Sequence, residues 1–126
     1  MQLQENWRRL LLRTEETAAK YEAAQREPQQ VGCKLCNDLE TIYDFTHWRL
    51  MPNAFPYDRY FSKSVMLVTK RHTDEANLST AELMEFRDIK KSNALAEYDT
   101  ILEHIPKQKS IPHHLHYHIV TIRRSK

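Results

Sequence analysis

The sequence predicts an α+β domain, in which helices group beside an antiparallel sheet. Two helical segments, at residues 2–27 and 79–98, alternate along the chain with short apolar runs that suit β-strands. The chain has 126 residues, of which 40% are apolar and 29% are charged. This composition is that of a globular protein, and the length is enough for one domain with a single modest core. The order helix, strands, helix, strands is typical of α+β proteins.

The first helix is predicted over residues 2–27, where side chains of one stripe recur at spacings of three and four, and Pro28 and Gly32 end it. The stripe consists of Leu3, Trp7, Leu10, Thr14, Thr17, Tyr21 and Ala24. It packs either on the body of the domain or on a second copy of the chain, and packing within the chain is favoured. We therefore expect an N-terminal helical extension at residues 1–30 and a main domain at residues 31–126.

Short elements follow the first helix. Residues 33–36 are predicted to form a turn, and residues 41–52 a strand that is rich in apolar and aromatic side chains, namely Ile42, Tyr43, Phe45, Trp48 and Leu50. Prolines break the pattern between residues 52 and 58, which indicates a loop. The apolar run at residues 64–70 then predicts a buried strand.

A second helix begins with the capping box of Ser79 and Glu82 and is expected to continue to residue 98. Its buried face should carry Leu83, Phe86 and Ile89. A strand is predicted at residues 99–105, a polar connection at 107–112, and a last strand at 114–122.

Composition also limits the function classes. The 19 basic and 17 acidic residues nearly balance, so there is no electrostatic reason to expect bulk nucleic-acid binding. No apolar run reaches the roughly 20 residues that a membrane helix needs, and no signal-peptide pattern is present at the start. We therefore expect a cytoplasmic protein without membrane partners. Gly32 is the only glycine, which argues against a P-loop or a Rossmann fingerprint.

Three histidines alternate along the last predicted strand. Because successive strand side chains point to opposite faces, His114, His116 and His118 should line one face at intervals of about 7 Å. The other face should carry Leu115, Tyr117 and Ile119 into the core. Packing alone explains three such imidazoles poorly, because each buried ring needs a hydrogen-bond partner. The pattern indicates a metal site, catalysis, or both.

Cys33 and Cys36 form a C-x-x-C pair, whose thiolates can bind zinc from a single turn. A tetrahedral site needs two further ligands, which His72 and one histidine of the last strand can supply. Redox chemistry and a chance pairing remain alternatives. A thioredoxin-type site is disfavoured, because no βαβ pattern surrounds the pair.

The segment His114–Val120 resembles the His-φ-His-φ-His-φ-φ motif of the histidine-triad superfamily, where φ is an apolar residue. The upstream strand that ends in Lys70, Arg71 and His72, and the capped helix after it, are similar to family features at the same places. The C-x-x-C pair resembles the zinc-binding pair of bacterial histidine-triad hydrolases and of galactose-1-phosphate uridylyltransferase. The resemblance covers roughly residues 33–122 and implies a histidine-triad-like antiparallel sheet with one main helix, often in a homodimer.

The resemblance also implies a mechanism. His116 matches the nucleophile that attacks the α-phosphate of a nucleotide and forms a nucleotidyl-histidine intermediate, and His118 matches a phosphate-binding residue. The implied activity is a nucleotide hydrolase or nucleotidyl transferase, which acts on a nucleotide or a nucleotide conjugate. The implied zinc ligands are Cys33, Cys36, His72 and His114.

Asn53 resembles an asparagine of the family's nucleoside pocket, and Ser110 is the hydroxyl expected near the triad for substrate binding. The chain departs from the family pattern at Ser64, where many members have a histidine, and in residues 103–110, which lack glycine. These departures are the reason for one alternative to an enzyme, namely a nucleotide-binding or interaction module with weak or no turnover. The other alternative is a zinc-dependent protein of another class, in which the three histidines of the triad together hold a catalytic metal.

Overall fold

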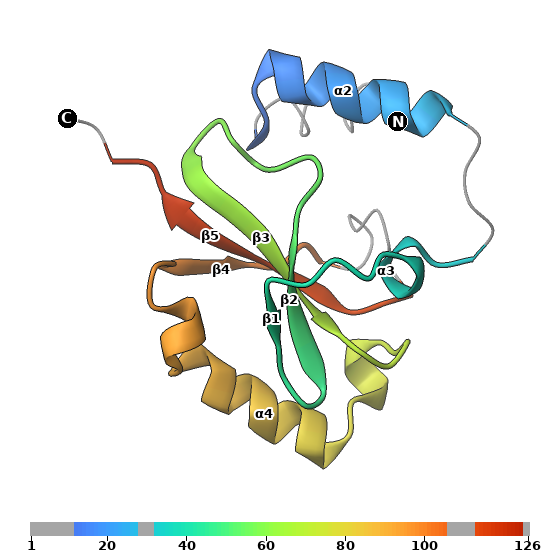
Figure 1. Cartoon of the computed structure of the whole chain (residues 1–126), viewed down its shortest axis with the longest axis vertical. Coiled ribbons are helices and arrows are strands. Elements are labelled where there is room, and N and C mark those ends of the chain that lie inside the picture. Colours follow the sequence, from blue (N-terminus) through green and yellow to red (C-terminus); the bar gives the residue numbers. More distant parts are fainter. Residues whose placement is uncertain (1–11, 28–31, 106–112, 125–126) are drawn as a thin grey trace.

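The computed structural model describes residues 12–27, 32–105 and 113–124, and a five-stranded sheet forms its centre (Figure 1). The strands are β1 (Tyr43–Asp44), β2 (Trp48–Pro52), β3 (Phe61–Thr69), β4 (Thr100–Leu102) and β5 (His116–Ile122). Their order in the sheet is β1-β2-β3-β5-β4, and every neighbouring pair is antiparallel. The predicted α+β class is therefore confirmed.

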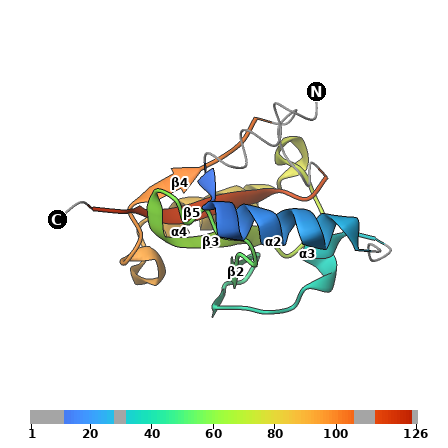
Figure 2. The same ribbon diagram turned by 90° about the horizontal axis from the view of Figure 1, so that it is seen from above.

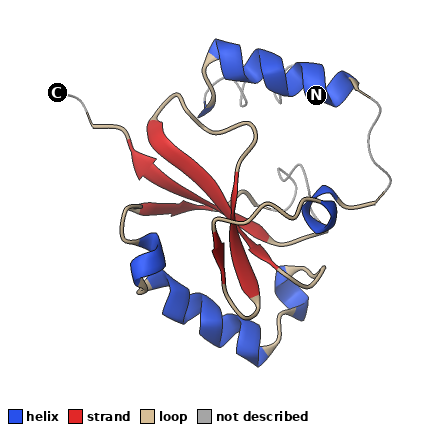
Figure 3. Ribbon diagram, in the orientation of Figure 1, coloured by secondary structure: helices blue, strands red, loops and turns tan. Residues whose placement is uncertain are grey.

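Helices flank this sheet on both sides. The α-helices are α2 (Glu15–Arg26), α3 (Lys34–Asn37) and α4 (Thr80–Lys90), and short 3-10 turns occupy Glu75–Asn77 and Asn93–Leu95. Helix α4 and helix α2 lie on opposite sides of the strands (Figures 2 and 3). Within the described part of the chain, no helix is both long enough and apolar enough to cross a membrane.

The core lies between the sheet and α4. As the alternation predicted, Leu115, Tyr117 and Ile119 are buried there. Phe86 of α4 stacks on Tyr117 with the ring centroids 4.7 Å apart, and on Trp48 of β2 at 5.1 Å. The side chains at the intervening positions of β5 consequently face the opposite side of the sheet, where α2 lies.

The prediction of one continuous helix over residues 2–27 is wrong. Thr14 is extended, with φ −64° and ψ 160°, and it caps α2 by accepting a hydrogen bond from the backbone of Thr17. A distant partner stabilises this break, because the Thr14 N–H and the Thr17 hydroxyl both donate to the Asp58 carboxylate, at 2.9 and 2.5 Å. Tyr21 is buried and contacts Phe55 edge-on, so this part of the stripe packs within the chain, as favoured.

The rest of the predicted stripe, Leu3, Trp7 and Leu10, lies outside the described residues. The division into an extension at residues 1–30 and a domain at residues 31–126 stays a prediction.

Two elements near the middle of the chain differ from their predictions. The turn predicted at residues 33–36 is instead the start of the one-turn helix α3, which spans Lys34–Asn37 and has Cys33 as its N-cap. The strand predicted at residues 41–52 is a hairpin, β1 and β2. The Glu85 carboxylate fixes its turn by accepting the N–H groups of Thr46, His47 and Trp48.

The second half of the chain differs mainly in element length. The capping box of Ser79 and Glu82 is confirmed, but α4 ends at Lys90 and not at residue 98. Leu83 was predicted to be buried and is 45% exposed, whereas Glu82 is 3% exposed because it binds Arg71 and caps the helix. The strand predicted at residues 99–105 is limited to β4, and β5 begins at His116, two residues later than expected.

Candidate functional site

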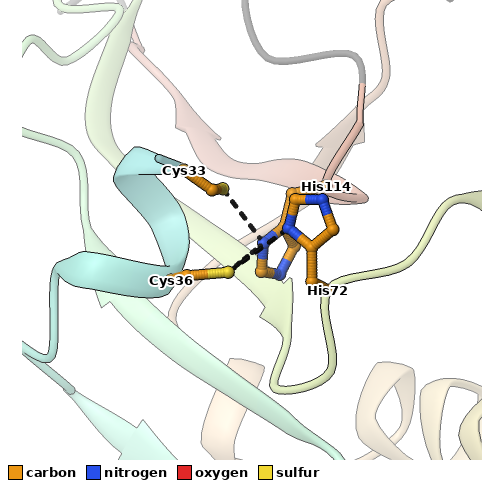
Figure 4. Close-up of side chains that lie close together, drawn as sticks. All are labelled: Cys33, Cys36, His72 and His114. Carbon is orange, nitrogen blue, oxygen red and sulfur yellow. Dashed lines mark hydrogen bonds between the residues drawn. The ribbon is translucent and has the colours of Figure 1, made fainter. Parts of the chain in front are cut away.

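Two thiols and two imidazoles meet at one end of the sheet. Cys33 and Cys36 project from α3, His72 from the loop after β3, and His114 from the bend that precedes β5 (Figure 4). The ligand atoms of these residues all lie within 4.8 Å of one another. The two sulfurs are each 3.4 Å from Nδ1 of His114, and Cys36 Sγ is 3.3 Å from Nδ1 of His72. The structure therefore assembles the predicted ligand set.

This donor set fits a tetrahedral metal ion. With Zn–S bonds of about 2.3 Å and Zn–N bonds of about 2.0–2.1 Å, ligand atoms of a tetrahedral site lie about 3.3–3.8 Å apart. The sulfur–nitrogen distances of 3.3 and 3.4 Å match this value. Four residues of these types can hold a metal ion, and the identification of that metal as zinc stays a prediction.

His114 is prepared for a ligand role by its own hydrogen bond. Its Nε2 lies 2.7 Å from the carbonyl oxygen of Thr69, which can only accept. The Nε2–H therefore donates to Thr69, and the lone pair resides on Nδ1, which faces the sulfurs. Burial lowers the pKa of His114 and keeps the ring neutral.

The thiol of Cys36 is still protonated in the absence of a metal ion. Burial and the neighbouring Cys33 raise the pKa of Cys36. Metal binding at this site must therefore release protons, and the metal affinity must fall in acid.

Arg49 of β2 holds the cysteine segment in place. Its side chain is buried and donates to the carbonyl oxygens of Leu35, Asp38 and Glu40 at 2.6, 2.5 and 3.0 Å. The guanidinium thus satisfies carbonyls at the C-terminal end of α3, where the helix dipole is negative. Sequence reasoning missed this role, and its only signal is an arginine inside an otherwise apolar strand.

His116 and His118 share one face of β5, as predicted, and both are buried. Their ring centroids are 5.5 Å apart, and the rings are nearly perpendicular. Nδ1 of His116 lies 3.0 Å from the carbonyl oxygen of His114. Because a carbonyl only accepts, Nδ1 carries the proton and Nε2 is the basic nitrogen of His116.

His118 belongs to a second cluster of polar rings. The hydroxyl of Tyr57 lies 3.2 Å from Nε2 of His118 and 2.8 Å from Nε2 of His104. Burial, reinforced by His116, His104 and Arg13, lowers the pKa of His118 to about 2, so the ring is neutral. Among the described residues, its Nδ1 has no hydrogen-bond partner although it is buried.

The segment before α2 completes this cluster. The guanidinium of Arg13 lies 4.8 Å from the ring centroid of Tyr57 and 4.4 Å from that of Tyr21, and its Nε donates to the carbonyl of Phe55. On the backbone side, the Tyr57 N–H donates to the Ser64 hydroxyl at 3.0 Å. Sequence reasoning missed Arg13 and Tyr57 and left His104 unassigned, because no motif links these residues.

The remaining predicted site residues differ in how well the structure places them. Asn53 accepts the N–H of Phe55, and its buried Nδ2 has no hydrogen-bond partner among the described residues. Ser110 lies outside the described residues. Within the described part of the chain, His114 is the only triad histidine in a potential metal cluster, so the triad is not assembled as a ligand set of its own.

In comparisons with known proteins, the chain matches no family model, no curated protein and no solved structure.

Proposed function

We propose that this protein is a nucleotide hydrolase or nucleotidyl transferase of histidine-triad type, which acts at the α-phosphate through His116. The observation that carries the proposal is the hydrogen bond from His116 Nδ1–H to the His114 carbonyl, 3.0 Å long. It makes Nε2 the nucleophilic nitrogen, and the strand holds His118 beside it on the same face. A neutral imidazole in a fixed tautomer is an effective nucleophile near neutral pH.

The reaction divides into two displacements at phosphorus. The Nε2 lone pair of His116 forms a nitrogen–phosphorus bond, and the leaving group departs with the electron pair of the broken phosphorus–oxygen bond. An acceptor, such as water, then attacks phosphorus and loses its proton, and the electrons of the nitrogen–phosphorus bond return to His116. Each step exchanges one bond at phosphorus for another, as in other covalent catalysis.

The metal ion that Cys33, Cys36, His72 and His114 would hold has a structural role in this proposal. It would fix His114, two residues from the nucleophile, whose carbonyl oxygen accepts the hydrogen bond from His116 Nδ1–H. Four protein ligands leave no open position for a substrate, as in structural zinc sites. The protein's own imidazoles therefore perform the chemistry.

Two buried polar atoms support a polar, anionic ligand. His118 Nδ1 and Asn53 Nδ2 both lack hydrogen-bond partners among the described residues. Buried polar groups are rarely left unsatisfied, and such groups are expected where a ligand binds. A nucleotide offers phosphate oxygens for an imidazole N–H and base or ribose oxygens for an amide. Nucleotides and nucleotide conjugates are accordingly the proposed substrate class.

The test uses the zinc-loaded protein and a panel of α-labelled adenylated and uridylylated substrates. We expect turnover and an acid-labile label on a peptide that contains residues 113–120. His116→Asn should abolish both while the metal content and the thermal midpoint stay unchanged. His118→Asn should lose less activity, because it binds phosphate and forms no bond to it.

His113→Asn is the matched control, because it removes an exposed imidazole next to the triad and should retain activity. Normal turnover by His116→Asn would refute the proposed nucleophile. Nucleotide binding without turnover by the wild-type protein would instead identify a binding module.

A further inference from the structure

The hydroxyl of Tyr57 bridges two imidazoles and has only one proton to share between them. It lies 2.8 Å from Nε2 of His104 and 3.2 Å from Nε2 of His118. If the hydroxyl donates to one imidazole, it must accept an N–H from the other. When the hydroxyl proton lies between the two rings, the Nε2 atoms of His104 and His118 differ in protonation, and the state of one ring determines the state of the other.

The surrounding contacts hold the Tyr57 ring in place. His118 lies against it, with the ring centroids 4.4 Å apart, and the Arg13 guanidinium lies 4.8 Å from the same centroid. His104 contacts Tyr57 edge-on at 5.8 Å and His118 at 5.6 Å. Tyr57 itself is only 6% exposed, and Ser64 binds its backbone N–H. The hydroxyl consequently stays between the two imidazoles.

We propose that Tyr57 and His104 are positioning residues that fix the tautomer of His118, so that its buried Nδ1 carries the proton accepted by a phosphate oxygen of the substrate. The proposal rests on the proposed function, which brings an anionic phosphate to His118. An anion needs a donor, and so Nδ1 must be protonated and Nε2 must be the acceptor. Tyr57 O–H then donates to His118, and His104 Nε2–H donates to Tyr57.

The chain of donors therefore runs in one direction, from His104 through Tyr57 and His118 to the phosphate. Each hydrogen bond polarises the next in a buried chain, which strengthens the last donor. The buried Nδ1 of His118, which lacks a hydrogen-bond partner among the described residues, is where that chain ends. The nucleophile His116 is oriented separately, through the His114 carbonyl.

The first experiment measures the tautomer directly. In the zinc-loaded protein with 15N-labelled histidine, inorganic phosphate is the probe, and the His118 resonances are assigned with His118→Asn. We expect His118 to be protonated at Nδ1 in the phosphate complex. Tyr57→Phe keeps the stacked ring but removes the bridging hydroxyl, so it should give a mixture of tautomers and about tenfold weaker phosphate binding. Tyr60→Phe, at an exposed ring, should change neither.

The second experiment separates hydrogen bonding from packing at His104. The amide of His104→Gln can still donate to Tyr57, whereas His104→Met cannot. We expect His104→Met to lower kcat/KM about tenfold, mainly through KM, and His104→Gln to stay within about threefold of the wild type. Equal effects of the two substitutions would show that His104 only fills space and would overturn its role.

The outcomes distinguish this inference from the proposed function. Protonation of His118 at Nε2 in the phosphate complex would overturn the inference. An unchanged tautomer and affinity in Tyr57→Phe would do the same, even if turnover through His116 is observed. If the tautomer responds as expected but no nucleotide is turned over, the proposed function fails and the positioning by Tyr57 and His104 stands.

Discussion

Replacing Arg49 should weaken metal binding although Arg49 is not a ligand. Arg49 is 8% exposed, and its guanidinium donates three hydrogen bonds, of 2.5 to 3.0 Å, to carbonyls of residues 35–40. Hydrogen bonds from a charged donor contribute about 1.5–3 kcal/mol each, and desolvation of the guanidinium offsets part of that sum. For Arg49→Met we therefore expect a loss of about 2–4 kcal/mol in unfolding free energy.

The same change should appear in the metal affinity. If about 2 kcal/mol of the loss falls on the ordering of the cysteine segment, the dissociation constant rises about 30-fold, since 1.4 kcal/mol is a factor of ten. This lies within the 10–100-fold range typical of residues that orient metal ligands. Arg49→Lys keeps the charge but not the fork of donors, so its effect should be smaller.

The assay is competition for zinc with a chromophoric chelator, together with urea unfolding in excess zinc. Arg59→Met is the matched control, because it replaces an exposed arginine outside the metal cluster. Wild-type zinc affinity in Arg49→Met, despite reduced stability, would refute the proposed coupling between Arg49 and the metal site.

Two further predictions concern the metal and the pH dependence of stability. Chelation should lower the thermal midpoint, and Cys33→Ser should lose metal and stability together. A purified protein that contains no metal and whose thermal midpoint does not respond to chelator would contradict the proposed metal site. The hydrogen bond from Arg71, with those from Ser79, lowers the pKa of Glu82 from 4.5 to about 2, so its stabilisation is fully present above pH 4.5 and is lost as the pH falls to about 2. This pKa shift corresponds to about 3 kcal/mol of stability, which solvent screening reduces to about 1–2 kcal/mol because Arg71 is half-exposed. The difference in unfolding free energy between the wild type and Glu82→Gln, measured by urea unfolding, should therefore shrink in acid. A difference that does not depend on pH would show that the Glu82 carboxylate is not its source.

Several features follow from local sequence patterns. The strict alternation from Leu115 to Ile119 places apolar side chains in the core and histidines on the other face, because strand geometry has a period of two. The capping box of Ser79 and Glu82 likewise marks the start of α4, because its hydrogen bonds span only three residues. The C-x-x-C spacing predicted a zinc-binding pair, with His72 and one histidine of the last strand as its partners. The choice of His114, which lies 81 residues from Cys33, came from the resemblance to the histidine-triad superfamily.

Other features depend on partners that are distant in the sequence. Asp58 ends the predicted first helix at Thr14 from 44 residues away, and Glu85 shapes the hairpin turn at His47 from 38 residues away. The break at Thr14 also has a local signal, since Thr14 is a preferred N-cap residue that Glu15 and Glu16 follow. The hairpin turn has none, because its backbone groups would otherwise continue a strand.

The sequence by itself therefore determined the α+β class, the two faces of the histidine strand and the candidate metal ligands. Only the tertiary structure decided the tautomers of His114 and His116 and the placement of His118 against Tyr57 and His104. The physical reason is that side-chain periodicity is a short-range property of the backbone. The protonation state of a buried imidazole is instead set by the atom opposite each ring nitrogen, and here those atoms come from residues as many as 61 positions away.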